Sequence, residues 1–221
     1  MAYIGRQPTA AALTASDITD GIISNAKLAQ DIISADTALG AEPADTDEFL
    51  VSDAGTLKRM DYSYIKAGGI TEVDSWRLSA NVAVSGDADF DDVTSNWERI
   101  DTDSFQVTGT GLSESSGIFS FPSTGKYLIS WYMNGVTGGD NQYFRIQLEV
   151  TTDNSSYDAA AQSAAESGTA TYAHNSGQHF LDVTNTTNVK FKFSNSGLGG
   201  NITGNTGFTR SGFVCTRLGD T

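Results

Sequence analysis

A glycine-lysine pair, Gly125-Lys126, is the first feature of the sequence that could do chemistry. A phosphate-binding loop needs several glycines that expose backbone N–H groups to the anion, a lysine, and then a serine or threonine hydroxyl that opens a helix. Here Tyr127 stands in place of that hydroxyl, and the following YLISWYMNGV has the alternating, β-branched and aromatic character of a strand. The pair therefore predicts a turn followed by a strand, with Lys126 as a solvated turn residue, and no nucleotide site.

Alternating aspartates are a second candidate, for binding calcium. Asp87, Asp89 and Asp91 alternate in GDADFDDVTSNWE, and Glu98 stands at the twelfth position counted from Asp87, as in an EF-hand loop. Asp92 occupies the place of the glycine that the sharp EF-hand turn requires, and the flanking residues predict strands, so we expect no EF-hand. Two interpretations stay open: calcium held by the carboxylates of Asp87, Asp89 and Asp91, or a solvated acidic loop.

The remaining catalytic residue types form no recognisable motif. His174 and His179 are the only histidines, and HNSGQH lacks a third metal ligand at usable spacing. Cys215 is the single cysteine, so it forms no disulfide within the chain, and its alternating neighbours predict a small core residue. Carboxylate pairs for glycoside cleavage are assembled in space from distant positions, and nothing in the sequence nominates one. We therefore predict no catalytic residues, no cofactor and no enzyme.

Composition limits the class of protein. The 221 residues hold one ordinary domain with an appendage, or two small domains. Charged residues make up only 18%, with 23 glycines and 3 prolines, which favours short strands and turns. A net charge of −14 argues against nucleic-acid binding. The sequence has neither a long apolar run nor a secretory signal, so we expect synthesis in a cytoplasm and no membrane insertion.

The first part of the chain, to about residue 67, differs from the rest. Apolar residues recur there at three- and four-residue steps, at Ile18, Ile22, Ala26, Ala29 and Ile33. This spacing is typical of one face of a short helix, with Ser16 or Asp17 as its cap. The same segment also reads as a ragged repeat, DITDGIIS and then AQDIIS, of extended pieces that wind around neighbouring chains. In either case the apolar stripe is too small to fold alone.

A hairpin pattern follows the apolar stripe. DEFLVSD and LKRMDYSYI flank Asp53-Ala54-Gly55, which predicts a strand, a tight turn, and a second strand or short helix. Gly68-Gly69 then predicts a hinge.

From Trp76 onward the pattern is that of many short strands separated by Gly, Asn, Asp and Ser. The candidate strands are WRLSANVAV, RIDTDSFQV, GIFSF, YLISWYMNGV, YFRIQLEVTT, GTATYAHNSG, HFLDVT, NVKFKFSNS and SGFVCTRLG. Their spacing predicts an antiparallel sandwich or barrel of roughly eight or more strands. In FSFPSTGKYLIS, Phe119 and Phe121 should share one inward face, and Tyr127, Ile129 and Trp131 another. DAAAQSAAESG stays open between a helical turn, a loop and a polar strand.

This C-terminal part resembles the C1q and tumour-necrosis-factor superfamily. FSFPSTGKYLISWYMNG is similar to the family's aromatic and Gly-x-Tyr signature, HFLDVTNTTNVKFKFSNS to its later pair of strands, and GFTRSGFVCTRLG to its closing strand. The resemblance covers about residues 76–219. It implies a mainly β, antiparallel jelly-roll sandwich, which associates as a homotrimer.

The N-terminal part is similar to the attachment regions of tail-fibre and related virion proteins of tailed bacteriophages. MAYIGRQP, ITDGIISNAKLA and above all DEFLVSDAGTLKRMDYS carry this resemblance. It implies an arm that anchors the chain to other virion proteins of the tail or capsid. The residues expected to be buried in that anchor are Ile18, Ile22, Ile23, Ile32, Ile33, Phe49, Leu50 and Tyr64.

Together the two resemblances predict a non-enzymatic virion protein made in the host cytoplasm. Residues 1–70 would be the attachment arm, and residues 71–221 a jelly roll that projects from the particle. Within this prediction a short trimeric tail fibre or spike, which contacts a host glycan or protein, competes with a capsid decoration protein. The fibre-like arm favours the first and the short length the second. A polysaccharide depolymerase is a third alternative, because jelly rolls host many functions.

Overall fold

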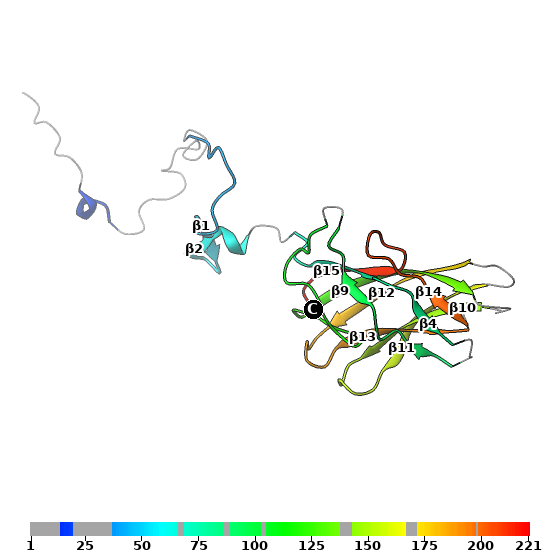
Figure 1. Ribbon diagram of the computed structural model, residues 1–221. Coiled ribbons are helices and arrows are strands. Elements are labelled where there is room, and N and C mark those ends of the chain that lie inside the picture. Colours follow the sequence, from blue (N-terminus) through cyan, green and yellow to red (C-terminus); the bar gives the residue numbers. More distant parts are fainter. Residues whose placement is uncertain are drawn as a thin grey trace, which may run out of the picture. The chain divides into compact units, whose positions relative to one another are not determined.

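The computed structural model describes residues 14–19, 37–65, 69–85, 89–102, 105–137, 143–166, 172–197 and 199–221. The chain divides into two compact units, Met1–Ala67 and Gly68–Thr221 (Figure 1). In its described part, the first unit contains a hairpin and short 3-10 turns. The second unit is a β-sandwich.

The hairpin of the first unit forms as predicted. Strand β1 (Glu48–Asp53) pairs antiparallel with β2 (Thr56–Asp61), and the 3-10 turn η3 (Tyr62–Tyr64) follows. Ala54 and Gly55, the two residues between the strands, have φ angles of 50° and 85°. Two successive positive φ angles are typical of the tight turn whose twist matches a two-residue hairpin.

The predicted N-terminal helix lies mostly outside the described residues. The described portion is a 3-10 turn, η1 (Ala15–Asp17). Asp17, one of the two expected caps, accepts hydrogen bonds at 2.7 Å from both the backbone N–H and the hydroxyl of Thr14. These bonds lower the pKa of the Asp17 carboxyl below its usual value.

In its described residues the second unit has two antiparallel sheets, one of six strands and one of seven. The six-stranded sheet runs β11-β10-β13-β8-β7, with β5 also paired to β13. Its strands are β5 (Asp91–Asp92), β7 (Ser113–Ser115), β8 (Ile118–Ser120), β10 (Tyr143–Thr151), β11 (Asp158–Glu166) and β13 (Lys190–Ser196). DAAAQSAAE thus forms a strand, with an irregularity in its register against β10.

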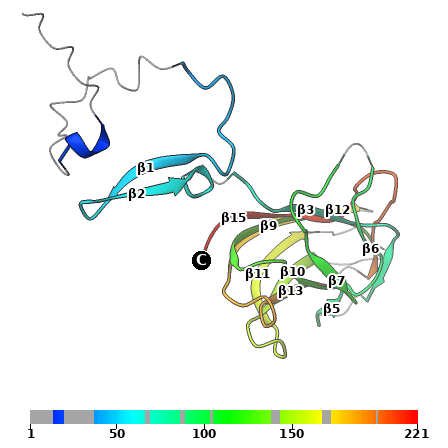
Figure 2. The ribbon, with the colours of Figure 1, turned by 90° about the vertical axis from the view of Figure 1, so that its left-hand side faces the viewer.

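The seven-stranded sheet runs β4-β14-β9-β15-β3-β6, with β12 also paired to β9. Its strands are β3 (Val73–Leu78), β4 (Val82–Val84), β6 (Trp97–Arg99), β9 (Gly125–Thr137), β12 (Tyr172–Val183), β14 (Gly200–Ile202) and β15 (Gly212–Gly219). Figure 2 shows the two sheets as stacked layers, with β9, β12 and β15 in one and β10, β11 and β13 in the other. The predicted antiparallel sandwich is therefore confirmed.

Aromatic rings fill the space between the sheets. Phe119 stacks on Phe191 at 5.1 Å between ring centroids, and its edge meets Phe213 at 4.7 Å. Tyr127, Ile129 and further inward residues of β9 are buried in the same cluster, as their alternation predicted. Their burial supplies most of the favourable free energy of a small sandwich.

Three strand predictions were wrong in extent. WRLSANVAV, predicted as one strand, forms the end of β3 and all of β4, with residues 79–81 between them. Of the described residues of RIDTDSFQV, only the first, Arg99, belongs to a strand, where it ends β6. The side chains of Asp101 and Thr102, just after it, bind Arg77. GTATYAHNSG and HFLDVT form parts of one strand, β12, and not two. Gly177 lies within β12 because a Cβ atom there would come within 2.3 Å of the Trp131 ring.

Cys215 is buried in the core, as predicted, and burial raises the pKa of its thiol. Among the described residues, no helix has the length and apolar character needed to cross a membrane.

Candidate functional site

The surface of the seven-stranded sheet that faces away from the core, here called the outer face, is the strongest candidate for a functional site. Tyr127 and Ile129 point into the core, so Leu128 between them points outward. The strand registers align Leu128 with residues of three other strands. This row across the outer face is Phe180, Leu128, Thr216 and Val73.

The apolar row is accessible to a partner. The Phe180 side chain is 53% exposed, whereas Leu128 and Val73 are partly exposed. On one side of the row, the oppositely charged residues Asp182 and Lys126 are directly opposite each other on neighbouring strands. An apolar centre with charged neighbours is the usual composition of a protein interface.

A second row runs parallel to the first. It contains Gln178, Ser130, Val214 and Ser75. Tyr132 belongs to the third row, opposite Gly212. A Cβ atom at Gly212 would lie 2.2 Å from the Trp76 carbonyl oxygen, so the close approach of the backbones requires glycine there. The outer face thus offers apolar and hydroxyl groups, which suit protein contact better than acid-base or nucleophilic chemistry.

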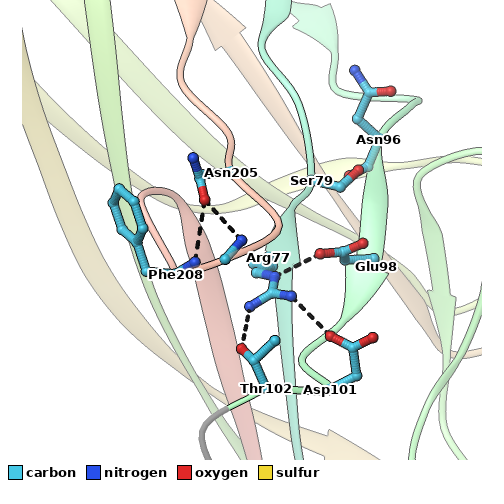
Figure 3. A network of polar contacts seen from close by, with 9 residues as sticks. Arg77, Ser79, Asn96, Glu98, Asp101, Thr102, Asn205 and Phe208 are labelled. Carbon is cyan, nitrogen blue, oxygen red and sulfur yellow. Dashed lines mark hydrogen bonds and ion pairs between the residues drawn. The ribbon is translucent and has the colours of Figure 1, made fainter.

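A buried arginine closes the outer face at its β3 and β6 end (Figure 3). Arg77 is 1% exposed although it points away from the core. Its guanidinium donates to Glu98 Oε1 at 2.6 Å, to Asp101 Oδ1 at 2.9 Å and to Thr102 Oγ1 at 2.8 Å. Asp101 and Thr102 lie in the segment that follows β6, so these bonds hold that segment against the sheet. The part of the outer face formed by β9, β12 and β15 stays open.

The connection between β14 and β15 carries an exposed aromatic ring. Asn205 Oδ1 accepts hydrogen bonds from the backbone N–H groups of Gly207 at 2.7 Å and Phe208 at 3.2 Å, as drawn in Figure 3. The Phe208 side chain is 52% exposed, and the Arg210 guanidinium lies 5.2 Å from the centroid of its ring. The connection therefore includes a turn that fixes an aromatic and a cationic group at the surface.

The predicted anchoring residues are exposed wherever the structure describes them. Ile18 is 42% exposed, Phe49 39%, Leu50 75% and Tyr64 79%. Leu57, which the sequence analysis did not select, is 68% exposed on the same face of the hairpin as Leu50. The other four predicted residues, Ile22, Ile23, Ile32 and Ile33, lie outside the described residues.

The acidic stretch is divided between two faces of β5. Asp91 accepts a hydrogen bond from the Ser85 hydroxyl, whereas Asp92 pairs with Lys192 at 2.7 Å. Glu98 binds Arg77 and is unavailable as a twelfth calcium ligand. In the described part of the chain no group of three or more His, Cys, Asp and Glu side chains could hold a metal, and Asp87 lies outside that part.

The two histidines do not form a common site. They lie five positions apart on β12, so their side chains point to opposite faces of the sheet. His174 Nδ1 lies 3.1 Å from Asn134 Oδ1 on the outer face. Burial lowers the pKa of His179 below its usual value.

Sequence reasoning did not find the outer face or the arginine network. The alternation in SGQHFLDV places Phe180 and its neighbour Leu181 on opposite faces of the strand. Because Leu181 is buried, this alternation was a usable signal that Phe180 is an exposed aromatic residue. Arg77 and Glu98 are 21 positions apart, and no local pattern links them.

Neither a protein-family model nor a curated protein matches the sequence. Among solved structures, Eiger TNF from S. frugiperda matches with a TM-score of 0.51 and 16% identity, over 69% of this chain and 96% of that one. Murine APRIL at pH 8.0 matches with a TM-score of 0.49 and 11% identity, over 66% of this chain and 98% of that one. The PRD1 vertex protein P5 matches with a TM-score of 0.42 and 16% identity, over 70% of this chain and all of that one.

The match to Eiger TNF has a TM-score above 0.5, which shows a shared fold. The unit Gly68–Thr221 therefore has a jelly-roll fold of the TNF and C1q type.

Proposed function

We propose that this chain is a non-enzymatic structural protein of a tailed-bacteriophage virion. In this proposal it is a short fibre or spike that forms a homotrimer through the outer face, attaches to the particle through its N-terminal unit, and presents its jelly roll to the host. The observation that carries the proposal is the open apolar row on the outer face.

The apolar row supports self-association. Phe180 and Leu128 are adjacent across two strands, and an exposed aromatic ring beside an aliphatic side chain is costly in water. Closed symmetry lets each copy bury the same face without leaving an unpaired surface. The position of the row in the middle of a rigid sheet favours a fixed interface over a transient one.

The hairpin supports attachment to a partner. A two-stranded hairpin is at best marginally stable alone in water, and Leu50 and Leu57 together expose a further apolar surface. Partner chains that bury this surface would stabilise both strands. The resemblance of the same residues to virion attachment regions is what assigns the partners to a phage particle.

The turn at Phe208 supports a contact with the host. An aromatic ring with a neighbouring arginine can stack on a sugar ring and bind its hydroxyl groups, and Asn205 holds the turn in place. The net charge of −14 makes docking to an anionic envelope unfavourable unless divalent cations intervene. We therefore expect a neutral glycan or a protein as the host partner.

Competition for adsorption tests this function. Purified full-length protein should slow adsorption of the phage that encodes it, and Phe208→Ser should weaken the competition, with the exposed Leu218→Ser as the matched control. A reconstruction of the particle should place density for the protein at the tail. Density at the symmetry axes of the capsid together with no competition would replace the fibre with a decoration protein, and shortening of host polysaccharide by the purified protein would favour a depolymerase.

A further inference from the structure

One polar side chain in the sandwich is buried without a complete set of partners. Asn195, in β13, is 0% exposed, and among the described residues its Oδ1 atom has no hydrogen-bond donor. Its Nδ2 atom donates to the backbone carbonyl of Arg145 in β10 at 2.9 Å. A buried amide oxygen with no partner is unfavourable, so such an atom points to a bound water or ion.

The strand register places an acidic side chain beside this oxygen. Asn195 is directly opposite Asp91 of β5, and directly opposed residues of antiparallel strands point to the same side of the sheet. β13 lies between β10 and β5. Nδ2 of Asn195 is bound to β10, which leaves Oδ1 as the amide atom available on the side of β5, where Asp91 lies.

A hydroxyl joins the same group. Ser85 Oγ donates to Asp91 Oδ2, and the Ser85 carbonyl accepts a hydrogen bond from Gly199 N–H at 3.1 Å. Asp91, Asn195 and Ser85 therefore bring a carboxylate, an amide oxygen and a hydroxyl to one end of the sandwich. Oxygen ligands of this kind are the ones that calcium prefers.

The neighbouring carboxylate faces the other way. Asp92 is opposite Ser194 and binds Lys192, which also lies 3.2 Å from Glu149. Burial acts to lower the pKa of Lys192, but its hydrogen bonds to the two carboxylates outweigh burial and raise it. The charge of Asp92 is thus already balanced by the Lys192 ammonium group, whereas the described partners of Asp91 include a hydroxyl and no cation.

We propose that Asp91, Asn195 and Ser85 form a calcium site that ties the connection between β4 and β5 to β13. Waters would complete the coordination shell, as in sites with few protein ligands. The proposal keeps Asp91 from the predicted aspartate set and adds two ligands that the sequence spacing did not reveal. It does not depend on the phage assignment or on trimer formation.

Calorimetric titration of the full-length protein with calcium chloride tests the site. We expect one ion per chain with a Kd of about 10⁻⁴ to 10⁻³ M, because the site has a single carboxylate. The midpoint of thermal unfolding should rise with calcium, and magnesium at equal concentration should raise it less, since magnesium gives up its waters reluctantly.

Two neighbouring substitutions separate this site from general charge effects. Asp91→Asn should weaken calcium binding at least about tenfold, and Asp92→Asn, which removes the same charge from the opposite face, should leave the Kd within about twofold. Asn195→Asp adds a second carboxylate, so it should tighten binding about tenfold and make thermal stability depend on calcium. If the Asn195→Asp variant is unfolded in the absence of calcium, the site can still be tested, because we then expect the variant to refold when calcium is added.

Two results would overturn the proposal. One is the absence of heat and of any thermal shift at about 10 mM calcium, which would leave a buried water as the partner of Asn195 Oδ1. The other is an equal loss of calcium binding in Asp91→Asn and Asp92→Asn, which would reduce the effect to nonspecific screening of an acidic surface.

Discussion

The hairpin of the first unit and the sandwich of the second are both antiparallel β-structure, yet they differ in what stabilises them. In the sandwich, Phe119, Phe191 and Phe213 pack with ring centroids 4.7 to 5.4 Å apart and are almost fully buried. The hairpin has a single ring contact, between Phe49 and Tyr62 at 6.0 Å, among its described residues. The sandwich has its own core, whereas the hairpin needs a partner to bury its apolar residues.

Removal of a ring from the core tests the first half of this comparison and should have the largest effect. Phe191→Ala should lower the free energy of unfolding by about 3–5 kcal/mol, because Phe191 is 0% exposed and contacts four other rings at its site. Chemical denaturation of the full chain measures this. Phe208→Ala is the matched control, because its ring is 52% exposed in the connection between β14 and β15, and it should cost less than about 1 kcal/mol.

Close packing inside the sandwich predicts a smaller effect at a glycine. Gly177→Ala should destabilise the chain by about 1–3 kcal/mol, because the new methyl group would collide with the Trp131 ring. Gly219→Ala is the control, since nothing lies within 4 Å of the position of its Cβ atom. Equal thermal midpoints for the two variants would contradict the close approach of β12 to Trp131.

The hairpin should respond to its turn and the sandwich should not. Ala54 adopts a φ of 50°, which asparagine tolerates better than alanine, and asparagine before glycine is the preferred pair for such turns. Ala54→Asn should therefore stabilise the hairpin by about 0.5–1 kcal/mol. Slower hydrogen exchange of the β1 and β2 amides, with unchanged exchange in β9, is the expected result.

A half-buried histidine predicts the smallest effect, as a dependence of stability on pH. Burial holds the pKa of His179 below its unfolded value of 6.5, so between the two values the unfolded chain binds a proton that the folded chain does not. Stability from this group is therefore present above pH 6.5 and is lost as the pH falls through the folded pKa. His179→Gln should flatten the fall in the thermal midpoint between about pH 7 and pH 5, and a parallel fall in both proteins would contradict it.

Local patterns in the sequence predicted most of the fold. Alternation located β9 and β15, the Asp53-Ala54-Gly55 turn located the hairpin, and the burial of Tyr127, Ile129 and Trp131 followed from a period of two. The alternation of residue types after Arg99 predicted a strand, because alternation does not distinguish a segment paired through its backbone in a sheet from a segment held by side-chain hydrogen bonds. That distinction depended on Arg77, which is distant in sequence.

The candidate sites were less predictable because they form across strands. Phe180, Leu128, Thr216 and Val73 lie in one row only after three strand registers are fixed. Asp91 was selected together with Asp87 and Asp89, but its position opposite Asn195 results from pairing between strands more than 100 positions apart. The chemical character of each residue was visible in the sequence, whereas its neighbours were not.

The oligomeric state of the full-length chain in solution tests the central claim most directly. Sedimentation equilibrium should give the mass of three chains, and Phe180→Asp should shift the protein to single chains, because the interface would then have to bury a carboxylate in place of an apolar ring opposite Leu128. Retention of the monomer fold by this variant, measured by circular dichroism, would assign the change to the interface. A wild-type chain that sediments as a monomer at micromolar concentration, or a Phe180→Asp variant that remains trimeric, would contradict the assignment of the outer face as the trimer interface.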